Sequence, residues 1–416
     1  MDTAQRNLIA CQALMEVYRE GAYSSLKLNE TMKDLSDEKD RAFVTRLFYG
    51  VISKTTQFDY VISRLAPKKP KPVVTVVLRM GLYMLRYMNV PAYATIDTQV
   101  ELIKKLGKKE LAGFVNALLR RSNEIVLPIN TGDKLMDISV NCSCPLWLVK
   151  KLSKQYGLEF TEKFLSSETD SRVHVRVNTD KISEDAFGML VPKATKSAGG
   201  YYADYATLKS ITPSLYTVQS LSSILATRFY AKGVEKGVKV IDMCAAPGGK
   251  AVYLAQLLPA CVTACDVHEH RVKLIRSYAE RMGVKLNAIQ NDATVFCEQF
   301  EQKFDVVVCD VPCSGIGVIH SKPDVLLSRK PEDISELANL QYNILTTSSK
   351  YVKVGGQINY STCTILKEEN ERVVQKFLQE NEDFELVTVD GKDYTYFFPH
   401  TDGCDGFFMA KLRRKQ

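Results

Sequence analysis

The hydrophobic pattern of this chain changes along its length, and the pattern of its second half constrains the fold most. From about residue 213 onward, short apolar runs rich in β-formers alternate with amphipathic stretches of helical period. This alternation predicts a mostly parallel, doubly wound α/β sheet. We expect strands at 238–243, 261–267, 285–290, 304–309 and 357–360, helices at 250–258, 270–282 and 332–352, and a closing strand at 406–412.

The first 125 residues have a different period. Five side chains recur at the 3,4 spacing of a buried helix stripe, namely Leu8, Cys11, Leu14, Met15 and Tyr18. Further helices are expected at 40–65, with Ser36 as N-cap, at 73–88, and as two segments split near Gly107. Because strand signals are few, this part is predicted to be an all-α bundle.

The segment between these two parts connects them. Residues 173–178 alternate apolar and polar side chains, as a half-buried strand does, and Pro145 precedes a helical run. We therefore predict a multidomain chain: a helical domain at 1–127, a small connecting α+β subdomain at 128–212, and an α/β Rossmann-like domain at 213–416.

Composition excludes some classes of protein. The chain has 416 residues, of which 45% are hydrophobic and 25% charged, as in ordinary globular proteins. Its apolar runs are all much shorter than the roughly 20 residues of a membrane span, and its polar first residues lack the apolar core of a signal peptide. We expect a cytoplasmic monomer without membrane association.

The net charge of +7 is concentrated in the helical domain. Residues 1–130 hold 20 Lys and Arg against 13 Asp and Glu, and the rest of the chain holds 35 of each. The excess follows residue 50, at Lys68, Lys69, Lys71, Lys104, Lys105, Lys108, Lys109, Arg120 and Arg121. A solvated helical face and a phosphate-binding surface both fit this pattern, and charge alone does not separate them.

Metal binding is not expected. Cys142 and Cys144 form a C-x-C pair, and Cys261, Cys265 and His268 fall close together. Neither group has the two C-x-x-C pairs at the spacing of a zinc finger. Eleven scattered cysteines in a chain without a secretion signal are expected to be reduced.

Two cysteines follow strand-like runs. Cys313 ends the run Asp-Val-Pro-Cys at 310–313, and Cys363 lies in Ser-Thr-Cys at 361–363. If the preceding strands are parallel in one sheet, both thiols emerge at its carboxyl edge, where open α/β sheets bind ligands. Two thiols there, beside a cofactor loop, indicate covalent chemistry on a ring that needs activation.

The run Asp-Met-Cys-Ala-Ala-Pro-Gly-Gly-Lys at 242–250 follows the first strand of the second half. Small residues and paired glycines at such a turn let the backbone approach a ligand closely. A P-loop would need glycine in place of Cys244 and a hydroxyl in place of Ala251, and the G-x-G-x-x-G of dinucleotide sites is absent. S-adenosylmethionine lacks phosphates and tolerates this loop. The candidate binding residues are Cys244, Ala245, Ala246, Pro247, Gly248, Gly249 and Lys250.

Acidic residues end three successive strands. Asp266 is placed to accept both ribose hydroxyls, which would suit NAD as well as S-adenosylmethionine, and Asp292 to accept from the adenine amino group. Either alone is explained equally well as a helix N-cap. With Asp310 at the end of a further strand, the three together favour a ligand site.

These motifs resemble the RNA 5-methylcytosine methyltransferases that use S-adenosylmethionine. The matching runs are 242–250, 266–271, 291–293, 310–315 and 361–363. The helical part is similar to the NusB-type RNA-binding domain at 40–51 and 114–120. The combination resembles the RsmB (Sun) family, which methylates a cytosine of bacterial small-subunit ribosomal RNA. The likeness is weakest at 128–200, and Ser220 stands where the family often has an acid.

The resemblance implies roles for individual residues. It assigns the nucleophile that attacks carbon 6 of cytosine to Cys363, help in product release to Cys313, and binding of the base to Asp310. It extends the cofactor set from the loop to Asp266, Arg271, Asp292 and Asp310. The implied cofactor is S-adenosylmethionine, and the implied partner is small-subunit ribosomal RNA.

Alternatives remain at this point. In DNA cytosine methyltransferases the cysteine of a Pro-Cys motif is the nucleophile, which would make Cys313 the attacking thiol. Amino-group methyltransferases usually place an aromatic residue at that position, so Cys313 favours methylation of carbon. A transfer-RNA methyltransferase and a catalytically inactive RNA-binding assembly factor are the other readings of the whole chain.

Overall fold

The computed structural model describes residues 3–20, 24–33, 35–168, 170 and 172–416. It divides into two compact units. One, the helical unit, consists of Met1–Ser166 together with Lys322–Arg329, and the other, the sheet unit, consists of Ser167–Ser321 and Lys330–Gln416. The three-segment division expected from sequence, with boundaries near 127 and 212, remains a prediction.

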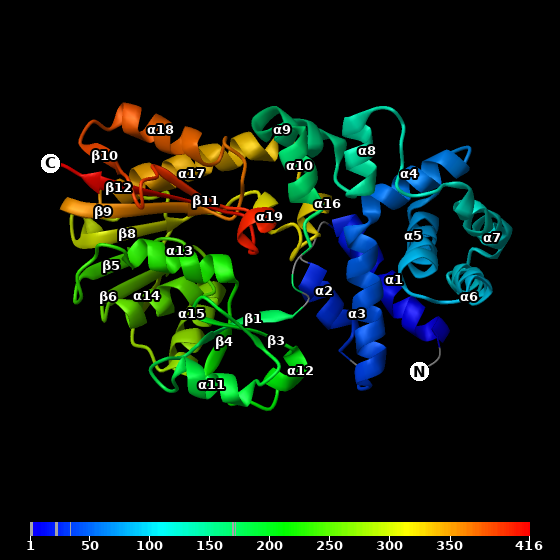
Figure 1. Ribbon diagram of the computed structural model, residues 1–416, viewed down its shortest axis with the longest axis horizontal. Helices are drawn as coiled ribbons and strands as arrows, with labels where there is room; N and C mark the ends of the chain where they lie inside the picture. The colour runs from blue at the N-terminus through cyan, green and yellow to red at the C-terminus, as the bar shows by residue number, and fades with distance from the viewer. Residues whose placement is uncertain (1–2, 21–23, 34, 169, 171) are drawn as a thin grey trace. The chain divides into compact units, whose positions relative to one another are not determined.

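The helical unit is all-α over its described residues (Figure 1), which agrees with the prediction for residues 1–127; residues 134–165, expected within an α+β subdomain, add further helices to it. Its α-helices are α1 (Thr3–Glu20), α2 (Ser24–Thr31), α3 (Glu38–Ser53), α4 (Thr55–Leu65), α5 (Pro72–Tyr87), α6 (Ala92–Lys105), α7 (Ala112–Arg121), α8 (Lys134–Asn141), α9 (Leu146–Tyr156), α10 (Leu158–Leu165) and the short α16 (Val325–Ser328). Single 3-10 turns, η1 (Lys109–Leu111) and η2 (Ser122–Glu124), flank α7.

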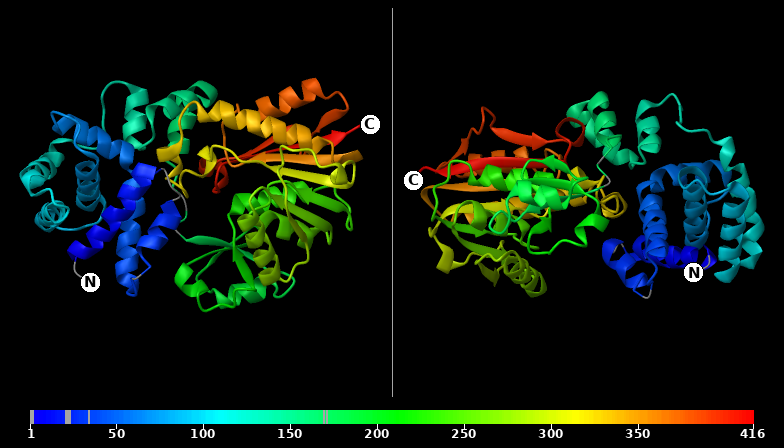
Figure 2. Two further views of the ribbon diagram at one scale, coloured as in Figure 1. Left: turned by 180° about the vertical axis from the view of Figure 1, so that it is seen from behind. Right: turned by 60° about the horizontal axis from the view of Figure 1, so that its bottom comes forward.

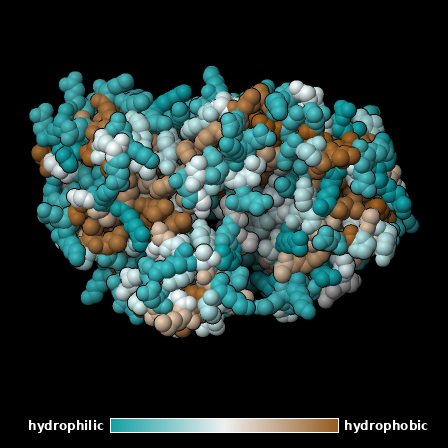
Figure 3. All heavy atoms as spheres, in the orientation of Figure 1, coloured by the Kyte–Doolittle hydropathy of each residue, from teal (hydrophilic) through white to brown (hydrophobic). Residues whose placement is uncertain are grey.

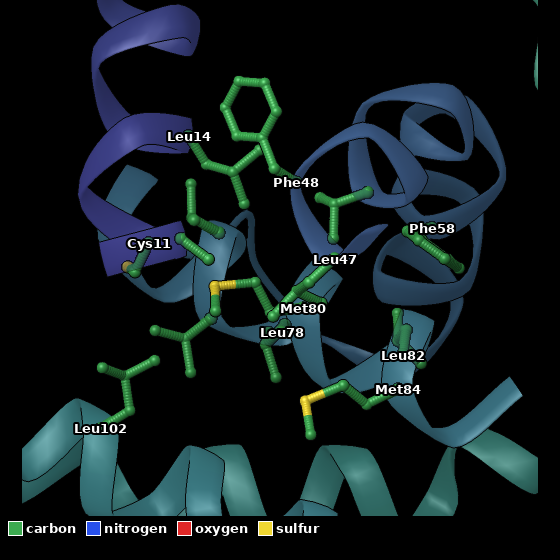
Figure 4. Close-up of a cluster of buried hydrophobic side chains, with 14 of the residues drawn as sticks. Cys11, Leu14, Leu47, Phe48, Phe58, Leu78, Met80, Leu82, Met84 and Leu102 are labelled. Carbon is green, nitrogen blue, oxygen red and sulfur yellow. The ribbon is translucent and has the colours of Figure 1, made fainter. Parts of the chain in front are cut away.

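The core of this unit lies between its long helices (Figure 4). Leu14 of α1, Leu47 and Phe48 of α3, and Met80 of α5 are all fully buried there. A single glycine lets α3 and α5 approach, because a Cβ at Gly50 would lie only 1.9 Å from Cζ of the Tyr83 ring. Close packing of large side chains explains why these residues recur at helical spacing.

The expected helix at 40–65 is two helices, and this expectation was wrong. The α3 helix ends at Ser53 and α4 begins at Thr55. At this junction the hydroxyls of Ser53 and Thr55 donate to the carbonyls of Gly50 and Val51, which offers the backbone an alternative to a straight helix. The N-cap of α3 is Asp37 and not Ser36, because the Asp37 carboxylate accepts the first backbone N–H groups.

The basic residues of the helical unit lie mostly at helix ends. Lys104 and Lys105 are in the last turn of α6, and Arg120 and Arg121 in the last turn of α7, where cations complement the helix dipole. Lys104 pairs with Glu101 and Arg121 with Glu124, whereas Lys68, Lys69 and Lys71 are exposed ahead of α5.

A small antiparallel sheet opens the sheet unit. Its strands are β1 (Val173–Val177), β2 (Thr195–Ser197), β3 (Gly200–Ala203) and β4 (Tyr216–Val218), in the order β2-β3-β1-β4. Two helices, α11 (Glu184–Leu190) and α12 (Tyr205–Leu208), accompany it. The strand expected at 173–178 is therefore confirmed, and the α+β character of this segment resides in residues 173–218.

The large sheet has eight strands in the order β10-β12-β9-β8-β5-β6-β7, with β11 also paired to β12. Strands β5 to β9 are mutually parallel, and β12 is antiparallel to its three neighbours. The strands are β5 (Lys239–Asp242), β6 (Cys261–Asp266), β7 (Asn287–Gln290), β8 (Phe304–Asp310), β9 (Val352–Thr362), β10 (Phe384–Val387), β11 (Tyr394–Phe397) and β12 (Phe407–Arg414). The predicted doubly wound, mostly parallel sheet is confirmed.

Helices cover both faces of this sheet (Figures 1 and 2). The covering helices are α13 (Leu221–Ala231), α14 (Gly249–Leu257) and α15 (Glu269–Met282) on one face, and α17 (Asp333–Ser349) and α18 (Glu371–Glu380) on the other. Strand β8 shows why its sequence is apolar throughout, since Val306 and Val308 pack toward the first face and Val307 and Cys309 toward the second. Helix α18 and strands β10 and β11 were not predicted.

The order of the strands fixes where a ligand site can form. After β5 the chain adds β6 and β7 on one side and then returns to place β8 on the other side of β5. Ligand sites of open α/β sheets lie at the carboxyl ends of the strands where the order reverses in this way. The ends of β5 and β8, at Asp242 and Asp310, therefore border the candidate ligand site.

On the face drawn in Figure 3, hydrophilic side chains make up most of the surface and hydrophobic ones form scattered patches. Scattered exposed apolar residues are normal for a folded chain. Within the described residues, no helix combines the length and the hydropathy that crossing a membrane requires.

Candidate active site

Strands β8 and β9 bring the predicted reactive residues together. In their parallel register Asp310 is the partner of Ser361, so the segments that follow them leave the sheet side by side. The Sγ atoms of Cys313 and Cys363 lie 3.0 Å apart, and both side chains are half-buried. The expectation that both thiols emerge at one edge of the sheet is confirmed, whereas their chemical roles remain to be argued.

Asp310 is fixed by hydrogen bonds from neighbouring elements. Its Oδ1 accepts from the Ser361 hydroxyl at 2.9 Å, and that hydroxyl lies 2.5 Å from the hydroxyl of Tyr230 on α13. Its Oδ2 lies 2.7 Å from Nζ of Lys250. A carboxylate held on both oxygens has a defined orientation, which a base-binding group requires.

Lys250 joins the cofactor loop to the cysteines. Burial lowers the pKa of Lys250, but the charge and hydrogen bond of Asp310, together with the nearby Cys363 thiol, outweigh that effect and raise it above its ordinary value. The ammonium is therefore retained at neutral pH. Because the interaction of two charges is mutual, this ammonium also stabilises a thiolate at Cys363.

A second acid lies beneath the site. Asp242 at the end of β5 is buried, and its Oδ1 accepts from the Cys244 backbone N–H at 3.3 Å. Burial and then the charge of Asp310 raise the pKa of Asp242 from its ordinary 3.8 to about 7. Asp242 therefore takes up a proton near neutral pH.

Sequence reasoning missed a buried network behind the cysteines. Glu369, just before α18, is fully buried and accepts from Ser314 on both the backbone N–H and the hydroxyl. Gln341 of α17 donates to Glu369 and also lies within hydrogen-bonding distance of the Pro312 carbonyl. The only sequence signal was an acidic run six residues beyond Cys363, and polar runs at helix starts are common.

The predicted cofactor loop forms a tight turn into α14. Gly248, the N-cap of that helix, has φ = 112°, a conformation that side chains other than glycine rarely adopt, and its N–H donates to the Ala245 carbonyl. A Cβ there would also lie 3.2 Å from Cα of Ile275 on α15. The residues of this loop, Cys244 through Lys250, lie at the carboxyl end of β5 as predicted.

The acids at the ends of β6 and β7 also have local partners. Asp266 is nearly buried, its Oδ1 accepting from the His268 backbone and its Oδ2 lying 3.3 Å from Arg271. Asp292 is exposed, and its Oδ1 accepts from both the backbone and the hydroxyl of Thr294. The turn-capping explanation therefore accounts for part of each carboxylate, and most fully for Asp292.

Two buried amide nitrogens at this edge have no hydrogen-bond partner among the residues that the structure describes. They are Nδ2 of Asn291, between Asp266 and Asp292, and Nε2 of Gln219, which lies 3.4 Å from where a Cβ of Gly249 would be. A buried donor without an acceptor is costly, so a polar ligand at this edge would satisfy both. Neither residue was singled out from sequence as a ligand contact.

Ser220, which departs from the family pattern, has a structural role. It is the N-cap of α13, and its hydroxyl oxygen accepts from the Ser223 backbone N–H. Serine and aspartate are about equally good N-caps, so the substitution preserves this helix start.

Comparison with known proteins agrees with this arrangement. The family model described as 16S rRNA methyltransferase RsmB/F matches residues 232–413, and the NusB family model matches residues 4–124. The chain is 34% identical to the probable ribosomal RNA small subunit methyltransferase B of Bacillus subtilis (strain 168), covering 98% of each. It is 31% identical to the ribosomal RNA small subunit methyltransferase B of Shigella sonnei (strain Ss046), covering 99% of each.

Solved structures match as well. The crystal structure titled PH0851 covers 98% of this chain and 99% of its own, with a TM-score of 0.81 and 25% identity. A methyltransferase homolog protein from Pyrococcus horikoshii covers 69% of this chain and 100% of its own, with a TM-score of 0.58 and 26% identity. With a helical NusB domain and a Rossmann-like sheet in one chain, and relatives matched over almost their whole length, this protein belongs to the ribosomal RNA small subunit methyltransferase B family.

Proposed function

We propose that this protein methylates carbon 5 of a cytosine in small-subunit ribosomal RNA through a covalent adduct with Cys363. Members of this family methylate small-subunit ribosomal RNA, and S-adenosylmethionine is the methyl donor. The carbon atom and the adduct are the proposed steps. The observation that carries them is the placement of Cys363 beside Cys313, Asp310 and the ammonium of Lys250.

The residues at the donor side of the edge fit S-adenosylmethionine, which supplies an electrophilic methyl group on its sulfonium sulfur. Asp266 offers a carboxylate for ribose hydroxyls, and the unpartnered amides of Asn291 and Gln219 offer donors that need an acceptor. The 244–250 loop presents backbone with small side chains. Arg271, paired with Asp266, orients that carboxylate.

Cys363 is proposed as the nucleophile. Carbon 5 of cytosine is a weak nucleophile until a thiolate adds to carbon 6 and pushes the electron pair of the 5,6 bond onto carbon 5. The Cys363 thiol must first lose its proton, and the ammonium of Lys250 stabilises the thiolate that results. After methyl transfer the proton on carbon 5 leaves, the double bond re-forms, and the bond between Sγ and carbon 6 breaks.

Asp310 and Cys313 are proposed to serve the same cycle in other ways. Asp310, oriented by Ser361 and Lys250, binds the base at its ring nitrogen and favours the protonated ring, which accepts a nucleophile more readily. Cys313, in contact with Cys363, remains a thiol and assists release of the methylated base. The hydrogen bond that the Cys313 thiol shares with Cys363, burial and then nearby negative charges raise the pKa of Cys313, which supports Cys363 rather than Cys313 as nucleophile.

The helical unit is proposed to orient the RNA. Contacts to phosphates set register without reading sequence, and Lys68, Lys69 and Lys71 offer exposed ammonium groups for them. A base stacked in a duplex cannot reach thiols that sit at a sheet edge, so the target cytosine must be unstacked or single-stranded.

Nucleoside analysis tests this proposal. The protein is incubated with small-subunit ribosomal RNA and methyl-labelled S-adenosylmethionine, and the digested RNA is resolved by mass spectrometry. We expect labelled 5-methylcytidine from ribosomal RNA, none from transfer RNA, and none with Cys363→Ala. Label in N4-methylcytidine, or label in transfer RNA instead, would contradict the proposal, and binding of the donor without any product would favour an inactive assembly factor.

A further inference from the structure

A buried carboxylate stands behind the two cysteines, in the segment that follows Cys363. Glu369 has no exposed surface, and its Oε1 accepts from the Ser314 backbone N–H at 2.7 Å and from Nε2 of Gln341 at 3.0 Å. Its Oε2 accepts from the Ser314 hydroxyl at 2.6 Å. These donors are all uncharged, so the carboxylate is solvated by hydrogen bonds and not by a counter-ion.

These bonds tie the segment that carries Cys313 to the segment that carries Cys363. The residue on one side of Cys313 is Ser314, held by Glu369 directly, and the carbonyl on the other side belongs to Pro312, held by Gln341. The backbone carbonyl of Glu369 accepts from the Tyr360 hydroxyl at 2.6 Å, which anchors the carboxylate to β9. Cys313 is thus fixed at both neighbours by one network.

A purely mechanical tie would not need a charge. Burying a carboxylate is unfavourable, and a neutral amide of the same shape would accept the same backbone hydrogen bond. Burial, partly opposed by the hydrogen bonds from Ser314 and Gln341, raises the pKa of Glu369. The ionised carboxylate is therefore destabilised by burial, a cost that a neutral glutamine would avoid. The charge itself therefore calls for an explanation.

The groups around Cys313 supply one. Three titratable residues lie around Cys313: Tyr360 on β9, Cys363 just after β9, and Glu369. Helix α17 contributes Gln341, which is neutral. The hydrogen bond that the Cys313 thiol shares with Cys363, burial, the charge of Cys363 and then that of Glu369 raise the pKa of Cys313, and a backbone bond at Gly315 opposes them. The other thiol of the pair, Cys363, interacts electrostatically with the ammonium of Lys250.

We propose that Glu369 is the positioning residue that makes the two cysteines unequal. Its hydrogen bonds hold Cys313 against Cys363, and its negative charge keeps Cys313 in the thiol form while Lys250 favours the thiolate at Cys363. The catalytic use of this difference between the two cysteines rests on the proposed function. The inequality itself is a property of the protein without RNA or donor.

Alkylation of Cys313 measures this property directly. The two thiols titrate together, so the experiment uses Cys363→Ala as background, in which Cys313 titrates alone. Iodoacetamide labelling is followed across a pH series by peptide mass spectrometry, and fragment ions distinguish Cys313 from Cys309, whose pKa burial raises to about 12. In this background we expect the midpoint for Cys313 to lie above the roughly 8.5 of an ordinary thiol.

Adding Glu369→Gln should move that midpoint down by about one pH unit, which corresponds to about tenfold faster labelling below the midpoint. The matched control is Glu371→Gln, which removes a carboxylate two residues away that accepts from Tyr396 and not from Ser314. We expect no shift from the control. Thermal unfolding of each variant establishes that the fold is retained.

Two results would overturn the proposal. One is an unchanged midpoint in the Glu369→Gln protein, which would leave Glu369 a structural tie. The other, which needs no Glu369 variant to fold, is an ordinary or low midpoint for Cys313 in Cys363→Ala alone. Labelling involves neither RNA nor donor, so the two proposals fail separately. An unexpected labelling midpoint would not contradict the methylation proposal, and a missing methylated product would not contradict the labelling result.

Discussion

The two ends of the proposed ligand-binding edge, a reaction end and a donor end, are built on different principles. At the reaction end, formed by Lys250, Asp310, Cys313, Cys363 and Glu369, the polar atoms bind partners that come from other strands and helices. At the donor end, formed by Gly248, Asp266, Arg271, Asn291 and Asp292, the carboxylates are held mainly by residues two to five positions away.

The difference teaches how each end should respond to change. Long-range partners fix the reaction end as a unit, so losing one member disturbs the chemistry and adding more donor does not restore it. Local caps leave the donor end largely intact when one ligand contact is lost, so the effect should fall on donor affinity. Substitutions at the two ends therefore separate kcat from KM.

The largest effect is expected from Cys363→Ala. Without the thiolate, carbon 5 is not activated, and kcat should fall by about a thousandfold or more at saturating donor. Steady-state methylation of ribosomal RNA and calorimetric binding of S-adenosylmethionine check this together. Unchanged donor affinity is expected, and a defect that excess donor cures would break the distinction between the two ends.

Lys250→Met removes the ammonium that pairs with Asp310 and interacts electrostatically with Cys363. We expect kcat to fall by about a hundredfold, because both the orientation of Asp310 and the stabilisation of the thiolate are lost. Lys250→Arg, which keeps the charge, should restore part of the rate. If instead the methionine variant only raised KM for the donor, Lys250 would belong to the donor end.

Asp266→Ala tests the donor end. Loss of the nearly buried carboxylate should raise KM for S-adenosylmethionine by about tenfold or more, with kcat changed little. Asp292→Ala is the matched comparison and should raise KM only about twofold, because this exposed carboxylate already serves the turn at Thr294. Equal effects from the two variants would contradict the ranking.

The smallest effect on turnover is expected from Asp242, which lies beneath both ends. Its substitution should instead change how the free energy of unfolding depends on pH. The pKa of Asp242 is about 7 in the fold against an ordinary 3.8, so the native state binds a proton that the unfolded chain has lost. Stability from this group is full below about pH 4 and declines as the pH rises to about 7. Asp242→Asn should remove that decline, flattening the slope by up to about 1 kcal/mol per pH unit, as chemical unfolding would measure.

Many helices and strands of this molecule could be predicted from its sequence, because the patterns that indicate them are local. Helical period identifies α1 and α5, apolar runs between turns identify β5 and β8, and the run at 242–250 identifies the turn from β5 into α14. The meeting of Cys313 and Cys363 also followed, because parallel strands end at one edge. The break between α3 and α4 was missed, because hydroxyl bonds to the preceding turn leave the hydrophobic period intact.

What could not be predicted depends on contacts between distant segments. Glu369 acquires its place only because α17 brings Gln341 and the β8 loop brings Ser314 to the same buried point. The pairing of Asp310 with Lys250 likewise joins the end of β8 to the first turn of α14. A single sequence holds these residues but not the distances between them, so their roles emerge only from the fold.

The assignment of the nucleophile is the central claim, and trapping of the adduct tests it most directly. Cys313→Ser and Cys363→Ser proteins are mixed separately with small-subunit ribosomal RNA and S-adenosylmethionine and run on denaturing gels. We predict a stable protein–RNA adduct from Cys313→Ser, because Cys363 still attacks while release is blocked, and none from Cys363→Ser. An adduct that forms with Cys363→Ser and is absent with Cys313→Ser would contradict the account.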